Sequence, residues 1–239
     1  MPNYELLFED EHFLVVHKPA GLLTIPDRFG NKDSLQNALE RVFGKVFVVH
    51  RLDRETSGVL CFARTEAAHR HLCLQFEHHT ADKYYLVLVD GSVHQEEGEI
   101  DKPIGPHPTI PNKMTITGRG KPSLTFYRVL ERFRNFTLVE ALLKTGRTHQ
   151  VRVHFQSIGY TLAVDALYGR RPAFFLSEIK GKAYRSGKFS EEERPLMERT
   201  SLHAYRLRIE HPATGERMEF KAELPKDFQA VLRQLRKAE

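Results

Sequence analysis

Short apolar segments of strand length, bounded by polar or turn-forming residues, recur throughout this chain of 239 residues. Runs of this length that are rich in β-branched and aromatic residues indicate strands. They occur at residues 5–8, 13–16, 45–50, 58–63, 84–89, 127–130, 137–143, 202–209 and 218–222. Helical spacing of apolar residues is found at 34–43, 65–76, 149–158 and 227–235. We therefore expect a domain of the α+β class.

Three of the predicted helices carry signals for their ends. Ser34 and Thr65 precede the first two helices, and their hydroxyls are suited to accept hydrogen bonds from free backbone N–H groups of the first turn. Gly159 follows the third helix and tolerates the left-handed conformation of a C-cap. These residues predict where the helices begin and end.

The composition excludes several classes of protein. Two cysteines, neither in a Cys-x-x-Cys pair, cannot form a disulfide framework and favour a reducing compartment. No apolar run is long enough to span a bilayer, and the first residues lack a basic region followed by an apolar stretch. We expect a cytosolic protein without membrane contact. The net charge of +5 permits a polyanionic partner.

Two segments depart from the general pattern. Residues 98–122 are rich in proline and glycine, so we expect loops and short strands there that divide the chain into two halves. Residues 170–199 hold eight Lys and Arg and five Glu, a local net charge of 8 − 5 = +3. The apolar pattern weakens over this stretch, which predicts an exposed basic insertion. We treat residues 1–239 as one domain.

The first candidate site is the loop at residues 50–58, which reads His-Arg-Leu-Asp-Arg-Glu-Thr-Ser-Gly and follows a predicted strand. It places an acid, Asp53, between Arg51 and Arg54. From the residue types alone the simpler interpretation is a surface turn, in which Asp53 caps the loop and the arginines face water.

The second candidate site is residues 144–154, Lys-Thr-Gly-Arg-Thr-His-Gln-Val-Arg-Val-His. A glycine-containing turn here leads into a helix, whose first N–H groups and dipole favour a phosphate. The segment is not a P-loop, because the long glycine spacing and the Lys-Ser/Thr ending are missing.

Together and in this order, the two segments resemble the signatures of the RluA-type pseudouridine synthases, which isomerise uridine in RNA. The resemblance extends over about residues 4–230. It also includes Lys83-Tyr84-Tyr85, Gly120-Lys121 through Tyr127, Asp165 to Gly169, Leu202-His203-Ala204 and His211 to Gly215. It implies a mixed, mainly antiparallel sheet with a central catalytic cleft between two halves. Because the first predicted strand begins near residue 5, we expect no RNA-binding module before the catalytic domain.

The resemblance assigns roles to particular residues. Asp53 would be the catalytic residue, Arg152 would pair with it and keep it ionised, and Tyr85 would stack on the base. Arg51 would enter the gap left by the extracted uridine. The remaining substrate-binding residues it implies are Thr56, Lys83, Arg147 and His149.

The chemistry of the reaction agrees with a single carboxylate. Uridine loses its nitrogen–carbon glycosidic bond, and a carbon of the base then joins the same sugar carbon, with no redox change. The sequence leaves open whether Asp53 attacks the sugar, adds to the base or removes a sugar proton. We expect no cofactor and no obligatory protein partner. The resemblance implies ribosomal or transfer RNA as the partner.

Other functions remain to be weighed. His69 and Cys73 lie four residues apart on a predicted helix, but Phe76 shares their face, so we expect Cys73 in the core and His69 at its rim rather than a metal site. A noncatalytic RNA-binding protein on the same fold is the alternative, although binding alone has no use for a carboxylate facing a polyanion. Phosphate-ester hydrolysis would require a carboxylate cluster that neither segment supplies.

Overall fold

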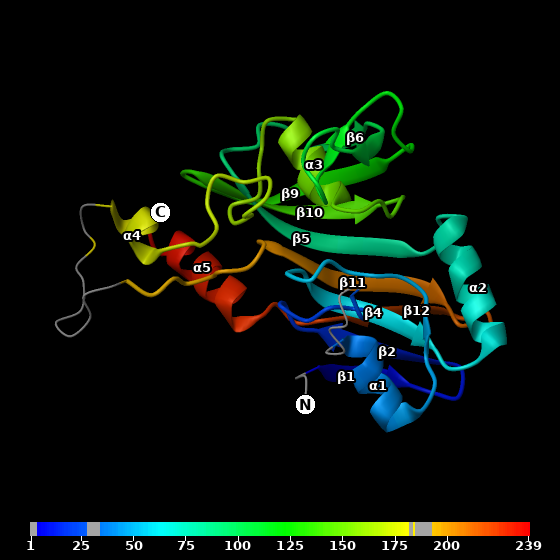
Figure 1. Cartoon of the computed structure of the whole chain (residues 1–239). Coiled ribbons are helices and arrows are strands. Elements are labelled where there is room, and N and C mark those ends of the chain that lie inside the picture. Colours follow the sequence, from blue (N-terminus) through cyan, green and yellow to red (C-terminus); the bar gives the residue numbers. More distant parts are fainter. Residues whose placement is uncertain (1–3, 28–33, 182–183, 185–192) are drawn as a thin grey trace.

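The computed structural model describes residues 4–27, 34–181, 184 and 193–239. Ten strands form one sheet that runs through both halves of the chain, in the order β1-β2-β4-β11-β5-β10-β9-β6, with β12 beside β11 and β3 beside β4. In Figure 1 strands β1, β2, β4, β11 and β12 lie below β5, and β6, β9 and β10 lie above it. Every described pairing in this sheet is antiparallel except that of β4 with β11, so the expected mixed, mainly antiparallel sheet is confirmed.

The strands of the sheet and the separate β7–β8 hairpin have the following bounds. They are β1 (Glu5–Glu9), β2 (Phe13–Lys18), β3 (Phe47–Val48), β4 (Ser57–Ala63), β5 (Asp82–Asp90), β6 (Glu97–Asp101), β7 (Ile104–Pro106), β8 (Met114–Ile116), β9 (Leu124–Phe133), β10 (Phe136–Leu143), β11 (Leu202–Glu210) and β12 (Arg217–Lys221). The helices are α1 (Leu35–Phe43), α2 (Glu66–Glu77), α3 (Gln150–Ser157), α4 (Leu176–Lys180) and α5 (Lys226–Arg236). Among the described residues, none of these helices has the length and apolar character needed to cross a membrane.

The predicted helix ends are confirmed. The Ser34 hydroxyl accepts a hydrogen bond from the N–H of Asn37, and the Thr65 hydroxyl accepts one from that of Ala68. Gly159 adopts a φ of 91° after α3, and its N–H donates to the carbonyl of Gln156. These contacts satisfy free N–H groups at the helix starts and a free carbonyl at a helix end. Each joins residues only three positions apart, so the local sequence is enough to predict it.

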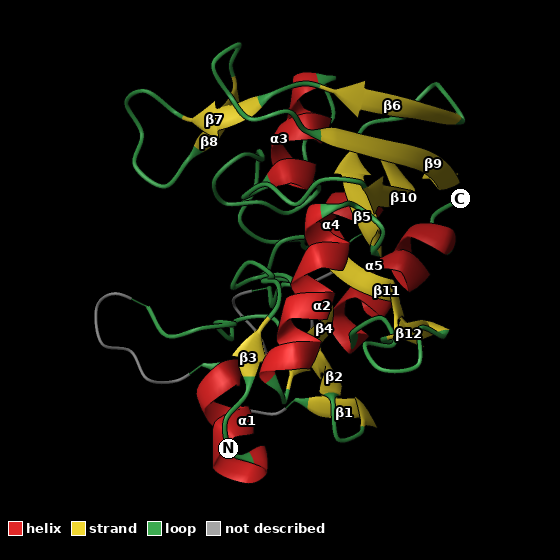
Figure 2. Ribbon diagram, turned by 90° about the vertical axis from the view of Figure 1, so that its right-hand side faces the viewer, coloured by secondary structure: helices red, strands yellow, loops and turns green. Residues whose placement is uncertain are grey.

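The helices cover the sheet in three places. Leu35 and Leu39 of α1 and Val151 and Phe155 of α3 pack on one apolar cluster with Tyr85 of β5. A second cluster joins α2 to β2, β4, β11 and β12, and a third joins α5 to β5, β9 and β10. Figure 2 shows α3 and the β7–β8 hairpin at one end of the molecule and α1 at the other.

The predicted strand at 45–50 is shorter than expected. β3 pairs with β4 only at Phe47 and Val48, opposite Ala63 and Phe62. β11 pairs with the other end of β4, at Ser57 and Gly58. The chain therefore leaves the sheet after β3, and this departure frees residues 49–56 to form the loop that carries Asp53.

The expectation of an exposed basic insertion at 170–199 is wrong at both ends of the segment. Phe174 and Met197 are buried, are joined by a β-bridge and pack against α5. Arg199 is also buried and forms an ion pair with Asp227 at 2.8 Å. The prediction rested on the net charge of the segment and did not identify these three buried residues, because apolar residues are sparse there. Residues 182–183 and 185–192 lie outside the described residues.

The expectation that Cys73 lies in the core is also wrong. Cys73 is half-buried, whereas Ala68, Leu72 and Gln75 form the buried face of α2. Gln75 takes this place because its side chain exchanges hydrogen bonds with the backbone N–H and carbonyl of Glu210. Gln75 can therefore be buried on the core face of α2, which the sequence spacing had assigned to Cys73. Its burial is tolerated because both polar groups of its side chain are hydrogen-bonded.

Candidate active site

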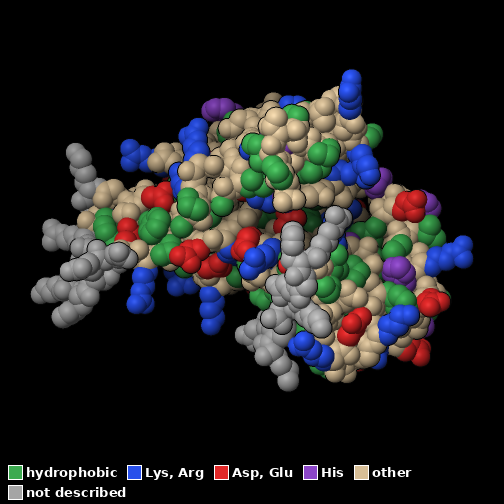
Figure 3. Space-filling view, viewed as in Figure 1, with side chains coloured by type: hydrophobic (Ala, Val, Ile, Leu, Met, Phe, Trp, Pro, Cys, Tyr) green, Lys and Arg blue, Asp and Glu red, His purple; other side chains and the backbone are tan. Residues whose placement is uncertain are grey.

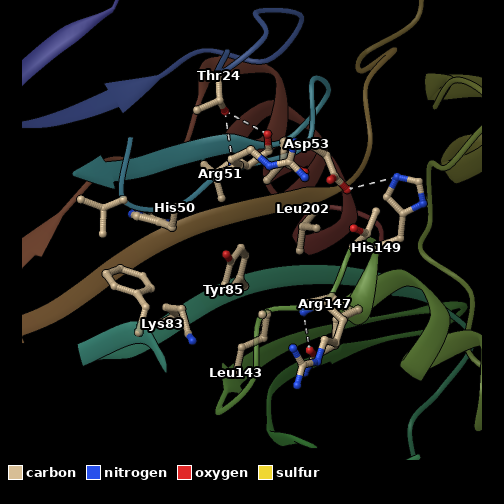
Figure 4. A pocket seen from close by; sticks show the side chains of 18 of the residues that line it. Thr24, His50, Arg51, Asp53, Lys83, Tyr85, Leu143, Arg147, His149 and Leu202 are labelled. Atoms are coloured by element: carbon tan, nitrogen blue, oxygen red, sulfur yellow. Dashed lines mark hydrogen bonds and ion pairs between the residues drawn. The ribbon is translucent and has the colours of Figure 1, made fainter. Parts of the chain in front are cut away.

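The two candidate segments meet across one cleft of about 840 Å³. The loop between β3 and β4 forms one wall, the turn before α3 forms the other, and β5 lies between them (Figure 4). All of the residues predicted for the site line this cleft: Arg51, Asp53, Thr56, Lys83, Tyr85, Arg147, His149 and Arg152. Lys and Arg side chains lie on both sides of the hollow between the two halves (Figure 3).

The loop that carries Asp53 is held from behind by residues 18–24. The Lys18 ammonium is fully buried and donates to the carbonyls of Pro19, Leu22 and Arg54 at 2.8, 2.7 and 3.0 Å. The Thr24 hydroxyl donates to the carbonyl of Leu52 and accepts from its N–H. Sequence reasoning missed both residues. They bind the backbone on either side of Asp53 and so fix where its side chain enters the cleft.

Glycine is required where this loop enters β4. Gly58 has a φ of 129°, which side chains rarely adopt, and a Cβ on it would lie 2.1 Å from the carbonyl oxygen of Ala204. The close approach allows β4 and β11 to pair in parallel at this point. Thr56 is only 2% exposed, and its N–H donates to the carbonyl of Asp53. Thr56 therefore lines the cleft, and its backbone also holds the loop.

Asp53 faces two positively polarised side chains from α3 and the turn before it. Its Oδ2 lies 3.4 Å from Nη1 of Arg152 and 3.8 Å from Nε2 of His149. The Asp53 side chain is 31% exposed. The predicted contact between Arg152 and Asp53 is therefore present, and a carboxylate accessible from the cleft lies beside a buried guanidinium.

Asp165, however, is the principal partner of Arg152. The Arg152 Nε and Nη2 donate to its two carboxylate oxygens at 2.6 and 2.7 Å, and Asp165 is 1% exposed. Although burial disfavours the charge, the hydrogen bonds to Asp165 raise the pKa of Arg152 above its usual value. Sequence reasoning noted the segment at 165–169 but gave Asp165 no role, because nothing local indicates which arginine it meets.

Tyr168 supports both neighbours of Asp53, the Arg152 guanidinium and the His149 imidazole. Its ring centroid lies 4.7 Å from the Arg152 guanidinium carbon, and its hydroxyl lies 2.8 Å from Nδ1 of His149. The same hydroxyl accepts a hydrogen bond from the N–H of Met114. It is thus placed to donate to Nδ1, which favours the tautomer with the proton on Nε2, facing Asp53. Burial lowers the pKa of His149, which favours its neutral form.

Tyr85 and Lys83 form the floor of the cleft. They lie two residues apart on β5 and so project from the same face. In Figure 4 Tyr85 lies between the loop of Arg51 and Asp53 and the turn of Arg147. Burial, with the charge of Asp53, raises the pKa of Tyr85 above its usual range. The Tyr85 phenol therefore keeps its proton and presents a neutral aromatic surface to the cleft.

The turn before α3 is shaped by Gln150. The side-chain oxygen of Gln150, Oε1, accepts hydrogen bonds from the Thr145 hydroxyl and the Arg147 N–H, at 2.8 and 3.0 Å. Its amide donates to the carbonyl of Leu124 and the hydroxyl of Thr125. His149 then adopts a left-handed conformation with a φ of 57°. Gln150, which sequence reasoning did not single out, thus holds Arg147 and His149 at the rim.

The described residues of the cleft do not form a metal-binding group. Among the described residues, no three His, Cys, Asp or Glu side chains are grouped closely enough to hold one. His69 contacts the carbonyl of Val48 and stacks on Phe47. The site therefore combines one accessible carboxylate, buried cations and an aromatic floor.

Comparisons with known proteins agree on one family. The profile of the RNA pseudouridylate synthase family matches residues 12–157. The ribosomal large subunit pseudouridine synthase D of Pseudomonas aeruginosa is 39% identical over 238 residues, which cover 97% of this chain and 72% of that protein. The protein of the same name from Zymomonas mobilis is 37% identical over 243 residues, with the same two coverages. A third, from Nitrosomonas europaea, is covered over 65% of its length.

Solved structures show the same fold. The human RNA pseudouridylate synthase domain containing 1 superposes with a TM-score of 0.68 at 28% identity, over 98% of this chain and 95% of that one. The human domain containing 4 gives a TM-score of 0.73 at 24% identity, over 97% and 93%. Fold and sequence together define an enzyme that acts on RNA. The chain belongs to the RNA pseudouridylate synthase family, whose reaction is the isomerisation of uridine in RNA to pseudouridine.

Proposed function

We propose that this chain converts uridine to pseudouridine in large-subunit ribosomal RNA, with Asp53 as its catalytic residue. The substrate class follows the names of the bacterial relatives. The observation that carries the catalytic assignment is the position of Asp53, a carboxylate open to the cleft and 3.4 Å from the guanidinium of Arg152. A carboxylate repels an RNA backbone, so its place in an RNA-binding cleft requires a chemical use.

Arg152 serves Asp53 in two ways. Its positive charge, fixed by Asp165, favours the ionised form of Asp53 and so keeps a reactive carboxylate available. Its rigid guanidinium also aims the carboxylate at the sugar or the base of a uridine in the cleft. Tyr85 provides a flat surface on which that base stacks.

The target uridine must leave the RNA stack to reach this cleft, because its reacting atoms are inaccessible inside a helix. Arg51 is exposed at the rim, on the same loop as Asp53. We assign it to the space that the extracted base leaves. Arg147, half-buried on the opposite wall with its Nε bonded to the carbonyl of Pro122, and His149 contact the extracted nucleotide.

The test compares Asp53→Asn with Glu55→Gln on large-subunit ribosomal RNA transcribed without modifications. Both substitutions remove one negative charge from the same loop, but only Asp53 faces Arg152. We expect Asp53→Asn to bind RNA as tightly as wild type or more tightly and to form no pseudouridine. Glu55→Gln should form pseudouridine at the wild-type rate.

Two outcomes would contradict the proposal. If Asp53 only caps its loop, Asp53→Asn should lose about 1 kcal/mol of stability and keep its activity. If the wild-type protein binds the RNA but forms no pseudouridine in it, the noncatalytic RNA-binding alternative replaces the enzyme.

A further inference from the structure

Two lysines are buried near the cleft, and their surroundings differ. Lys18 donates to three backbone carbonyls behind the Asp53 loop. Lys83 is only 7% exposed and lines the cleft, yet none of the described residues accepts a hydrogen bond from its ammonium or forms an ion pair with it. Its ammonium lies over the Phe76 ring, with 5.5 Å between Nζ and the ring centroid. Lys83 is therefore a largely buried cation without a hydrogen-bonded or ion-paired partner among the described residues.

The strands on both sides of Lys83 offer it no carboxylate. In the sheet register, β10 places Leu143 opposite Lys83 and β11 places Leu207 opposite it. The adjacent acid on its own strand, Asp82, is engaged elsewhere, because it pairs with Lys144 at 3.3 Å and with Arg217 at 3.0 Å. Residue 82 also points to the opposite face of β5 from residue 83.

The other titratable groups around Lys83 do not compensate its charge either. Arg147, from the turn before α3, is itself cationic. Burial lowers the pKa of His50 to about 3 and also lowers that of His79, so both imidazoles are neutral at physiological pH. Burial, together with the charge of Lys144, outweighs the opposing charge of Asp82 and lowers the pKa of Lys83 to about 8.

An uncompensated buried cation lowers stability, because water no longer solvates it and no partner replaces the water. A protein gains from such a group only when an anion forms beside it. Charges arranged in advance around a developing negative charge are among the largest contributions to catalysis. The position of Lys83 therefore suggests an anion that exists during the reaction and is absent from the free protein.

The isomerisation produces such an anion. When the bond between the sugar carbon and N1 of uracil breaks, the electron pair remains with the base, and its carbonyl oxygens share the negative charge. C5 of the base then bonds to the sugar carbon, C5 loses its proton and N1 gains one. Lys83 projects from the same face of β5 as Tyr85, about 7 Å along the strand, so a base stacked on Tyr85 lies beside it.

We propose that the Lys83 ammonium binds a carbonyl oxygen of the target uracil and stabilises the negative charge that the base carries after the glycosidic bond breaks. This assignment rests on the proposed function. Lys83 exchanges no proton and forms no covalent bond in this step. Its contribution is larger in the transition state than in the bound substrate, because neutral uracil attracts an ammonium less than its anion does.

The experiment measures single-turnover pseudouridine formation on the same unmodified ribosomal RNA by wild type, Lys83→Met, Lys83→Arg and Lys144→Met. Lys83→Met should slow turnover by about 10²- to 10³-fold, which is the usual effect of removing one donor to a developing anion. RNA affinity should change little. Lys144→Met removes a neighbouring lysine that already has a carboxylate partner and should keep the wild-type rate.

Two further readouts separate this role from others. Lys83→Met should melt at a higher temperature than wild type, because an apolar side chain of similar length replaces an unpaired buried cation. In wild type kcat/KM should fall above pH 8, as free Lys83 loses its proton, and Lys83→Arg, which stays charged, should lose this decline.

Four results would overturn the proposal. Wild-type turnover by Lys83→Met would show that Lys83 has no part in the chemistry. A loss confined to RNA affinity and its salt dependence would assign Lys83 to a phosphate. A kcat/KM that rises through pH 8, with an inactive Lys83→Arg, would make it a general base. A lower melting temperature with a parallel loss of activity would make it structural. An inactive wild type would instead contradict the proposed function itself.

Discussion

Arg152 donates two hydrogen bonds, of 2.6 and 2.7 Å, to Asp165, and it contacts Asp53 only at 3.4 Å. Asp165 also accepts the N–H groups of Leu167 and Tyr168, so it is itself held by a backbone turn. The guanidinium is thus fixed by one carboxylate and turns its remaining edge to another. Arg152 thus holds Asp165 in a tight pair and Asp53 in a looser contact.

The first prediction concerns Asp165 as a positioning residue. Asp165→Asn leaves a buried guanidinium with an incomplete partner, so we expect a loss of about 3 kcal/mol in the free energy of unfolding. Because Arg152 is no longer held, turnover should also fall by about 10²-fold. Asp90→Asn is the control, since Asp90 pairs with Arg171 away from the cleft. Urea denaturation and single-turnover assays of both variants measure the two effects, and full activity of Asp165→Asn would contradict the role.

The second prediction concerns Lys18. Lys18→Met removes the donor for three carbonyls, two in the segment behind the Asp53 loop and one in the loop itself, and should cost about 3 kcal/mol of stability. Turnover should fall because the loop is no longer fixed, whereas RNA affinity should remain. Lys180→Met, at an exposed lysine, serves as the control. An active Lys18→Met with a wild-type melting temperature would show that the loop needs no such support.

The third prediction concerns stability at acidic pH. His203 is fully buried between the Ser57 hydroxyl and the carbonyl of Ala222, and burial lowers its pKa to about 4. Between pH 6.5 and 4 the unfolded chain binds a proton that folded His203 does not, so stability should fall as the pH falls through this range. The slope from this one residue is at most about 1.4 kcal/mol per pH unit.

Denaturation curves of His203→Asn and of the exposed-site control His94→Asn, measured at several pH values, test this prediction. His203→Asn should show a flatter dependence between pH 6.5 and 4, whereas His94→Asn should follow wild type. Equal slopes in all three proteins would exclude His203 as a source of acid sensitivity.

The fourth prediction is that basic residues of the 170–199 segment contact RNA. It is limited to those between the buried residues Phe174 and Met197. Replacing Lys182, Arg185 and Lys188 with serine should weaken RNA binding and reduce its salt dependence, by about one unit of slope per lost phosphate contact. Activity on saturating RNA should persist. Filter-binding measurements at several salt concentrations test this, and an unchanged slope would remove the segment from the RNA interface. Deletion of all of 170–199 is unsuitable, because it removes Phe174 and Met197 from the core.

Much of the fold and of the candidate site could be predicted from local sequence. The hydroxyls of Ser34 and Thr65 and the flexibility of Gly159 act within a few residues of their own position, and the structure confirms each helix end that they predicted. The two segments with the family's signatures likewise predicted which residues form the two walls of the cleft, although the sequence does not give their distance in space.

The sequence by itself determined most of the strands and helices and which residue types meet in the cleft, because these depend on short-range spacing and on recognisable motifs. Only the tertiary structure decided which partners the charged residues choose. Lys18 resembles any lysine at a strand end until Arg54, 36 residues away, folds over it, and Asp165 gains its role only beside Arg152. Burial removes water from these groups, so each needs a partner across the fold, and Lys83 differs from them because no described residue forms a hydrogen bond or an ion pair with it.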